Sequence, residues 1–215
     1  MKLVPTHAFI TKCHSLTKLF DGTHKMSTFM LKLEKEAQLD PLRYDPDKYV
    51  GDGFEYFVEL FLMLHPFDNR VGVYNYAPVE EDDNGVDGVG VNIWNEKSVV
   101  QIKYRGNTSY KLTATQDHLS NMFSDGALKH HVNPDVHNPN NYRHFVFTTA
   151  DGLNFYTDQQ MYKSKVRCFA FKDFRNLLDN NMPFWAKAKE IAILLDKQNK
   201  KTATTKKKTK AKSKA

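Results

Sequence analysis

Apolar residues recur every three or four positions in two segments near the start of the chain. This period predicts a helix over residues 27–39, capped by Ser27, and a second helix over residues 52–65, opened by Gly51-Asp52-Gly53. Their buried stripes are expected to be Phe29, Met30, Leu33 and Ala37 in the first helix and Phe54, Phe57, Val58 and Phe61 in the second. We interpret residues 1–48 as a helical extension that precedes the main domain.

Farther along the chain the apolar period changes to two, which is the period of a strand. Three strands are predicted, at residues 71–76, 86–94 and 98–105. In the third strand, Val100, Ile102 and Tyr104 point to one face, and Gln101, Lys103 and Arg105 point to the other. One face of this strand is therefore suited to a core, while the other presents a row of polar groups.

The second half of the chain carries weaker helical and extended signals. We expect a helix over about residues 113–124, strands at 144–148 and 166–171, a short helix at 172–179 and a last helix at 183–197. A loop rich in Asn, His and Pro occupies residues 125–142. The element order, α-β-β-β-α-β-β-α-α, predicts an α/β fold for a main domain at residues 49–197.

The net charge of +6 is unevenly distributed along the chain. Nine of the 31 basic residues are lysines from Lys197 onward, and no acidic residue follows them, so the preceding part carries a net charge of −3. Residues 198–215 lack large apolar side chains, and we predict a disordered basic tail there. Such a tail either aids solubility or localisation or binds nucleic acid by displacing counterions from phosphates. The lysines expected to bind DNA are Lys206, Lys207, Lys208, Lys210 and Lys212.

Composition excludes several classes of protein. No apolar run approaches the roughly 18 residues of a membrane span, and the N-terminus has no apolar stretch long enough for a secretory signal. Two cysteines, Cys13 and Cys168, are too few for a disulfide framework or a cysteine zinc cluster. We therefore expect an intracellular protein with reduced, buried thiols and no membrane partner.

The polar face of the third strand follows an acidic turn at residues 83–87, which ends on Asp87. Hydrolysis of a phosphodiester needs a hard cation held by oxygen ligands, an activated water and positive charge near the leaving oxygen. Asp87 and Gln101 can supply ligands, and Lys103 can supply the charge. Glu55 on the preceding helix can add a carboxylate. We therefore predict a site for Mg²⁺ or Mn²⁺ at these residues.

Three motifs resemble the PD-(D/E)XK nuclease superfamily and, within it, the Mrr-type branch of restriction endonucleases. The matches are Gly51 with Phe54-Glu55, then Asp83-Asn84-Gly85-Val86-Asp87, then Gln101-Ile102-Lys103, within about residues 50–150. The resemblance implies a restriction-endonuclease-like core, in which a small mixed β-sheet is flanked by helices, and a metal-dependent DNA endonuclease activity. It also implies that Asp87, Gln101 and Glu55 bind the metal and that Lys103 completes the catalytic centre.

Three details qualify this resemblance. The acidic run at residues 80–83 takes the place of a short glycine-rich lead and would repel DNA unless metal or lysines offset it. Glu59, one turn from Glu55, competes for the helix role, and we favour Glu55 because it follows Phe54 directly. Arg105, at the end of the polar row, is expected to contact nucleic acid.

Other interpretations remain open. Residues 130–138 with His144 superficially resemble a His-Asn-His nuclease but lack its hairpin–helix pattern, so a polar surface loop is the simpler interpretation. A non-catalytic DNA-binding or chromatin-like protein would explain the tail but leaves Gln101 and Lys103 without a role. Double-strand cleavage with one site per chain would imply a homodimer. Four aromatic residues can stack on unpaired bases or serve the core: Tyr104, Tyr110, Phe155 and Tyr156.

Overall fold

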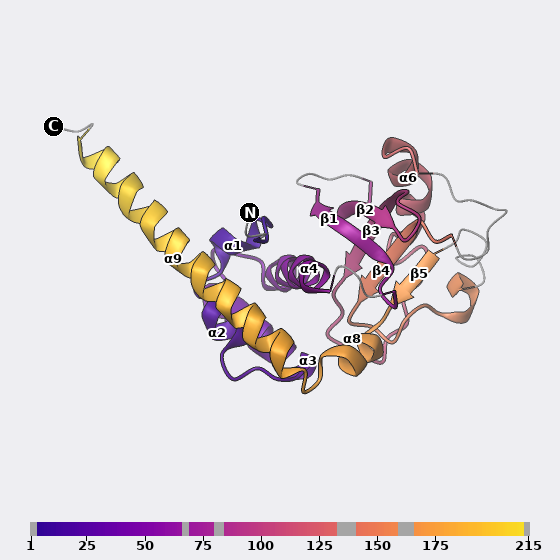
Figure 1. The fold of residues 1–215 in the computed structure, drawn as a ribbon, viewed down its shortest axis with the longest axis horizontal. Coiled ribbons are helices and arrows are strands. Elements are labelled where there is room, and N and C mark those ends of the chain that lie inside the picture. The colour runs from indigo at the N-terminus through magenta and orange to yellow at the C-terminus, as the bar shows by residue number, and fades with distance from the viewer. Residues whose placement is uncertain (1–3, 66–68, 80–83, 133–140, 159–165, 213–215) are drawn as a thin grey trace.

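Among the residues that the structure describes, five strands form one mixed sheet (Figure 1). The computed structural model describes residues 4–65, 69–79, 84–132, 141–158 and 166–212, with backbone alone over 202–212. The strands are β1 (Val73–Pro78), β2 (Gly88–Asn92), β3 (Lys97–Lys103), β4 (His144–Thr148) and β5 (Val166–Phe169), in that order across the sheet. β1, β2 and β3 pair antiparallel, whereas β3, β4 and β5 pair parallel. The structure therefore confirms an α/β fold with a mixed sheet.

Helices cover both faces of this sheet. On one face, α4 (Pro46–Leu64) packs in the larger core with α1 (Phe9–Lys12), α2 (Leu16–Phe20), α3 (Met26–Ala37), α8 (Phe171–Leu178) and α9 (Met182–Lys212). On the other face, α5 (Leu119–Asn121), the π-helix η1 (Met122–Gly126) and α6 (Ala127–Lys129) cover a smaller core. β3 contributes Val100 and Ile102 to the larger core and Val99 to the smaller one. The predicted alternation of the side chains is therefore confirmed, but the face predicted to present polar groups is itself covered, because Val99 and Gln101 are fully buried, and the strand ends at Lys103, before Arg105.

Helix α4 begins at Pro46, earlier than the predicted start at residue 52. Asp45 caps it, because its carboxylate accepts two N–H groups of the first turn (2.9 and 3.1 Å). The glycines that were expected to open the helix lie inside it. A Cβ at Gly53 would lie 2.4 Å from Leu33 Cδ1 on α3, so the bare backbone of Gly53 allows α3 and α4 to approach closely.

The N-terminal cap of α3 comes from a distant part of the chain. Ser27 lies inside this helix rather than at its cap, so that prediction was wrong. Instead, the backbone N–H of Met26 donates to Asp179 Oδ1 (2.9 Å), which lies just beyond α8. The acceptor is 153 residues away, and no local sequence signal identifies it.

The segment predicted as one helix over residues 113–124 is divided. Its first half forms turns, in which the N–H of Thr113 donates to the buried carboxylate of Asp117 (2.6 Å). This side-chain bond competes with a first helical turn. His118 then adopts a left-handed conformation (φ 55°), and α5, η1 and α6 follow without a break. The helical run therefore extends into the segment predicted to be a loop.

The chain beyond residue 197 continues α9, so the predicted disordered tail is corrected to a helix over residues 198–212. Figure 1 shows this helix extending away from the body past α1 and α2. Its inner part is anchored, because Asp196 accepts two N–H groups at the start of α2 (both 3.0 Å) and Asn199 Nδ2 donates to Ile10 O (2.7 Å). Helix propagation from an anchored segment is inexpensive, and residues 198–212 contain neither Gly nor Pro.

We expect Gly53→Ala to destabilise the protein although alanine is the better helix former. The new methyl group would overlap Leu33 and reach within 3.0 Å of Phe9 Cζ, and both side chains are fully buried with little room to move. Gly51→Ala is the matched control, because nothing lies within 4 Å of its Cβ position. Urea denaturation should show a loss of about 1 to 3 kcal/mol for Gly53→Ala and a gain of up to about 1 kcal/mol for Gly51→Ala. Equal stability of the two variants would contradict this packing.

Candidate active site

The carboxylate of Asp87 lies at the start of β2, where this strand meets β3. The backbone N–H of Asp87 donates to Val100 O (2.9 Å), and its Oδ2 accepts the N–H of Ile102 (2.5 Å). These two bonds lie on either side of Gln101 along β3. The structure therefore brings Asp87 and Gln101 together.

A tight turn before β2 sets this geometry. Asn84 and Gly85 both adopt left-handed conformations (φ 54° and 78°), which asparagine and glycine tolerate best. A Cβ at Gly85 would lie 3.2 Å from Gln101 Nε2, so the glycine also makes room for the glutamine side chain. Asp83, the first acid of the predicted motif, lies with the rest of the acidic run 80–83 outside the described residues.

Gln101 and Lys103 continue the polar face of β3. The side chain of Gln101 is fully buried, and neither its Oε1 nor its Nε2 has a hydrogen-bond partner among the described residues. An unpaired buried polar group costs about 1 to 3 kcal/mol, so stability does not explain this glutamine. Lys103 is half-buried at the end of the strand, and its ammonium makes no hydrogen bond or ion pair within the described part of the chain.

The two acids on α4 have different partners. Glu59 is buried and accepts three hydrogen bonds from the N-terminal segment: from Thr6 N (2.7 Å), Thr6 Oγ1 (3.0 Å) and His7 N (3.0 Å). The side chain of Glu55 is 28% exposed, and its Oε2 lies 3.0 Å from Nε2 of His7. Because the N-terminal segment occupies Glu59, Glu55 is the helix carboxylate that remains available to the site.

The charges of this site are not balanced by its own residues. Burial raises the pKa of Asp87 to about 7, and the negative charge of Glu55 contributes to this shift. The ammonium of Lys103, the N–H of Ile102 and the ring of His7 lower this pKa but do not cancel the increase. Glu55 and Asp87 therefore lie close enough to repel each other. A hard cation that binds both carboxylates relieves such repulsion.

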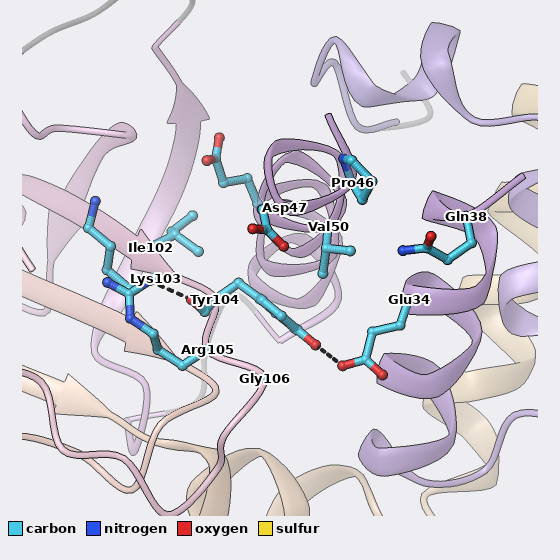
Figure 2. A pocket seen from close by; sticks show the side chains of 12 residues that line it. Glu34, Gln38, Pro46, Asp47, Val50, Ile102, Lys103, Tyr104, Arg105 and Gly106 are labelled. Carbon is cyan, nitrogen blue, oxygen red and sulfur yellow. Dashed lines mark hydrogen bonds between the residues drawn. The ribbon is translucent and has the colours of Figure 1, made fainter. Parts of the chain in front are cut away.

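A cleft of about 670 Å³ opens between the end of β3, α3 and α4. Figure 2 shows Lys103 and Arg105 on the sheet side of this cleft and Glu34 on α3 across from them. Tyr104 reaches between the two sides, and its hydroxyl donates to Glu34. Glu55 also lines the cleft. Acidic and basic side chains thus face each other across a space open to solvent.

The structure divides the four predicted catalytic residues into two pairs. Glu55 and Lys103 line the cleft, whereas Asp87 and Gln101 do not. The two pairs are connected through β3, because Asp87 binds the N–H of Ile102, which is a lining residue of the cleft. The influence of both Glu55 and Lys103 on the pKa of Asp87 shows that the pairs are also coupled electrostatically.

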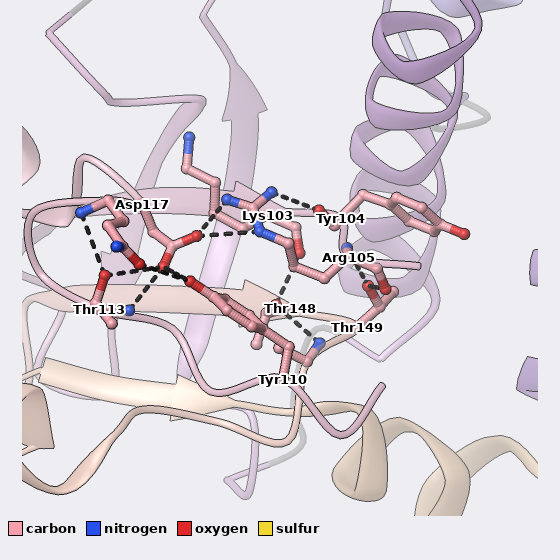
Figure 3. Close-up of polar contacts among 10 residues, drawn as sticks. Lys103, Tyr104, Arg105, Tyr110, Thr113, Asp117, Thr148 and Thr149 are labelled. Carbon is pink, nitrogen blue, oxygen red and sulfur yellow. Dashed lines mark hydrogen bonds and ion pairs between the residues drawn. The ribbon is translucent and has the colours of Figure 1, made fainter. Parts of the chain in front are cut away.

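Arg105 is held in place rather than left as a free cation. Its Nε donates to Asp117 Oδ1 (3.0 Å), its Nη2 donates to the same oxygen, and its Nη1 donates to Tyr104 O (2.6 Å), as Figure 3 shows. Asp117 is almost fully buried and also accepts from the hydroxyl of Tyr110 (3.2 Å) and from Thr113 N (2.6 Å). The side chain of Arg105 remains 36% exposed at the cleft, so its contact with nucleic acid stays a prediction.

The available ligand atoms suit a hard divalent cation, which prefers oxygen. They are the carboxylates of Asp87 and Glu55 and the amide oxygen of Gln101. The observation that favours a ligand here is that this buried amide has no hydrogen-bond partner in the described part of the chain. Within the described ranges, no three His, Cys, Asp or Glu side chains form a metal-binding group. A cation at this position would therefore rely on the amide of Gln101 and on water to complete its coordination.

The other predicted residues contribute less to this picture. The five lysines predicted to bind DNA lie in α9, but their side chains lie outside the described residues. His144 is buried on β4 and packs against the ring of Phe123, with the ring centroids 5.4 Å apart. Residues 133–140 of the loop next to it lie outside the described part of the chain. Phe155 and Tyr156 are exposed, by 71% and 78%.

Sequence reasoning missed three residues that shape the site: His7, Glu34 and Asp117. His7 reaches Glu55 from 48 residues away, and Glu34 binds Tyr104 from 70 residues away. None of the three lies in a recognisable motif, and each looks like an ordinary polar surface residue. No sequence signal could identify the first two, because only tertiary packing brings Glu34 to the cleft and His7 to Glu55.

We expect Asp87→Asn to stabilise the metal-free protein at pH 8. The pKa of Asp87 is about 7 in the folded chain and 3.8 ordinarily, so folding takes up a proton between these values. The free energy of unfolding therefore falls as the pH rises from about 4 to about 7 and then stays low. Asparagine carries no charge and avoids this loss while it can still accept the N–H of Ile102.

Thermal unfolding in EDTA measures this effect. At pH 8 the Asn variant should unfold at least roughly 2 to 4 °C above the wild type, which corresponds to about 1 kcal/mol for a chain of this size. At pH 5 the difference should be smaller, because the wild-type carboxyl is then protonated in the folded state. If the variant is less stable than the wild type at pH 8, the negative charge of Asp87 does not destabilise the fold, and the prediction is wrong.

Comparison of the chain with models of protein families, with curated proteins and with solved structures gives no match. No helix in the described ranges is both long and apolar enough to cross a membrane. The function must therefore be inferred from the site itself: a buried carboxylate with a raised pKa, and an amide and a lysine beside the cleft for which the described residues provide no hydrogen-bond or ion-pair partner.

Proposed function

We propose that the protein is a metal-dependent DNA endonuclease with a restriction-endonuclease-like core. One observation carries the proposal. At the junction of β2 and β3, Asp87 binds the N–H of Ile102, the residue after Gln101, and lies within electrostatic range of Lys103, while the buried amide of Gln101 has no hydrogen-bond partner among the described residues. A buried amide without a partner and a buried, repelled carboxylate both lower stability, so a role in function explains them better than a role in folding. The order of the elements that carry these residues agrees with the nuclease superfamily that the motifs resemble.

In this proposal Asp87, Gln101 and Glu55 hold Mg²⁺ or Mn²⁺, which supplies a Lewis acid and lowers the pKa of a bound water. The N–H of Ile102 orients one carboxylate oxygen of Asp87 and leaves the other for a ligand. Lys103 lies two residues beyond Gln101 on the same face of β3. Its ammonium offers positive charge to the phosphate oxygens, whose negative charge increases in the transition state.

The distribution of charge favours a polyanion such as DNA as the substrate. The chain before Lys197 carries a net charge of −3 and offers little overall attraction to a polyanion, whereas the lysine-rich end of α9 does. Because α9 extends away from the body (Figure 1), these lysines can bind phosphates at a distance from the cleft. A homodimer would allow both strands of a duplex to be cut together. We place this activity inside the cell, because Cys13 and Cys168 are both free thiols.

Plasmid cleavage with Mg²⁺ or Mn²⁺ tests the proposal. We expect Lys103→Ala to slow cleavage by at least about 100-fold, because it removes charge stabilisation from the transition state. Lys97→Ala is the matched control, since Lys97 lies on the same strand and face but at the opposite, exposed end. EDTA should abolish cleavage by every variant. DNA binding without metal-dependent cleavage, unchanged in Lys103→Ala, would instead support a non-catalytic DNA-binding protein.

Truncation after Lys201 separates DNA binding from cleavage. This cut removes six lysines but keeps the bond between Asn199 and Ile10. We expect weaker DNA binding, a salt dependence of log K that is less steep by up to about 5, and unchanged cleavage at saturating DNA. A full-length control with the six lysines replaced by arginine should bind as the wild type does. Loss of cleavage at saturating DNA would place this end of the chain in the active site.

A further inference from the structure

The N-terminal segment, residues 6–12, follows an acidic stripe on α4. Three acids at three- and four-residue spacing form this stripe: Asp52, Glu55 and Glu59. The segment contacts each of them, through backbone N–H groups at Glu59, through His7 at Glu55 and through Lys12 at Asp52. An anchor therefore lies on each side of the contact between His7 and Glu55.

The ring of His7 is held in one orientation and one tautomer. Its Nδ1 accepts the backbone N–H of Phe9 (3.1 Å), so the ring proton lies on Nε2. Nε2 then donates to Glu55 Oε2 (3.0 Å). The side chain of His7 is 12% exposed, so little water competes for this N–H group. The hydrogen bond is thus directed from a ring that cannot turn freely.

The carboxylate of Glu55 has no other hydrogen-bond partner within the described residues. A glutamate on a helix beside an open cleft otherwise samples several rotamers. The bond from His7 restrains Glu55 through one oxygen and leaves Oε1 for another interaction. Glu55 lines the same cleft as Ile102, whose N–H binds the carboxylate of Asp87 (2.5 Å).

We propose that His7 is a positioning residue of the site, which orients Glu55 toward Asp87 so that both carboxylates hold the same divalent cation. This inference rests on the proposed metal-dependent function. Hydrogen bonds to ligating side chains hold them in position, and loss of such a bond lowers metal affinity by about 10- to 100-fold. The N-terminal segment then belongs to the site as well as to the fold.

Binding of Mn²⁺ to the full chain, followed by electron paramagnetic resonance, tests this role without requiring cleavage. His7→Asn keeps an acceptor for the N–H of Phe9 but is too short to reach Glu55, and it should weaken Mn²⁺ binding by about 10- to 100-fold. His7→Gln can place an amide N–H near the position of Nε2 and should restore most of the affinity. His14→Asn is the matched control, because His14 pairs with Glu36 (3.2 Å) outside the cleft, and it should bind Mn²⁺ as the wild type does.

A double variant adds a measurement that a merely structural role would not change. If His7 acts through Glu55, His7→Asn combined with Glu55→Gln should bind Mn²⁺ no more weakly than Glu55→Gln alone. In cleavage assays, His7→Asn should raise the Mn²⁺ concentration for half-maximal activity by the same factor as in the binding assay and leave the rate at saturating metal nearly unchanged.

Two outcomes would overturn the inference in different ways. Wild-type Mn²⁺ affinity in His7→Asn, or additive losses in the double variant, would remove His7 from the site and leave the proposed nuclease function intact. A wild-type chain that neither binds Mn²⁺ nor cleaves DNA would overturn both.

Discussion

The burial of α4 between the sheet and the helices α1, α2, α3 and α9 is the constraint on which the rest of the structure depends (Figure 1). Phe57 contacts Phe29 of α3 and Trp185 of α9, with ring centroids 4.4 and 6.1 Å apart, while Phe61 contacts Phe169 of β5 at 5.5 Å. Burial of these large rings removes much apolar surface from water. It also requires a buried charge on α4 to find a partner, because a buried charge without one is costly.

The polar groups around α4 and β3 meet this requirement unequally. Glu59 receives three hydrogen bonds from the N-terminal segment and behaves as a structural acid. Asp87 and Gln101 lack full compensation for their burial. The carboxylate of Asp87 is repelled by Glu55, and the amide of Gln101 has no hydrogen-bond partner among the described residues. Asp87 and Gln101 therefore lower the stability of the fold next to the cleft, and the packing of the rest of the protein offsets this loss. Such a local loss is typical of sites that bind a ligand.

The N-terminal segment joins the candidate site to the basic end of the chain. His7 contacts Glu55, and three residues later the carbonyl of Ile10 accepts a hydrogen bond from Asn199 on α9. The part of α9 that carries the lysines thus follows directly on Asn199, which is bound to the N-terminal segment. If these lysines bind DNA, as we propose, the binding surface and the cleft are held in a definite relation by the short helices between them rather than by a flexible tether.

The sequence by itself determined the class of fold, the two faces of β3 and the proximity of Asp87 to Gln101. Each of these follows from local geometry. Side chains alternate between the two faces of a strand, and a short connection between two strands allows few ways of pairing them. The extent of α9 was not predictable in this way, because helix formation beyond residue 197 depends on an inner part that is anchored to α1 and α2.

The different hydrogen-bond partners of Glu55 and Glu59 were decided only by the tertiary structure. Two glutamates one turn apart on the same helix present the same signal in the sequence. Their roles separate because the N-terminal segment, about 50 residues away along the chain, donates its backbone N–H groups to Glu59 and its histidine ring to Glu55. A hydrogen-bond partner that is distant in sequence leaves no local sequence pattern. Only the packing of the folded chain brings it to the glutamate.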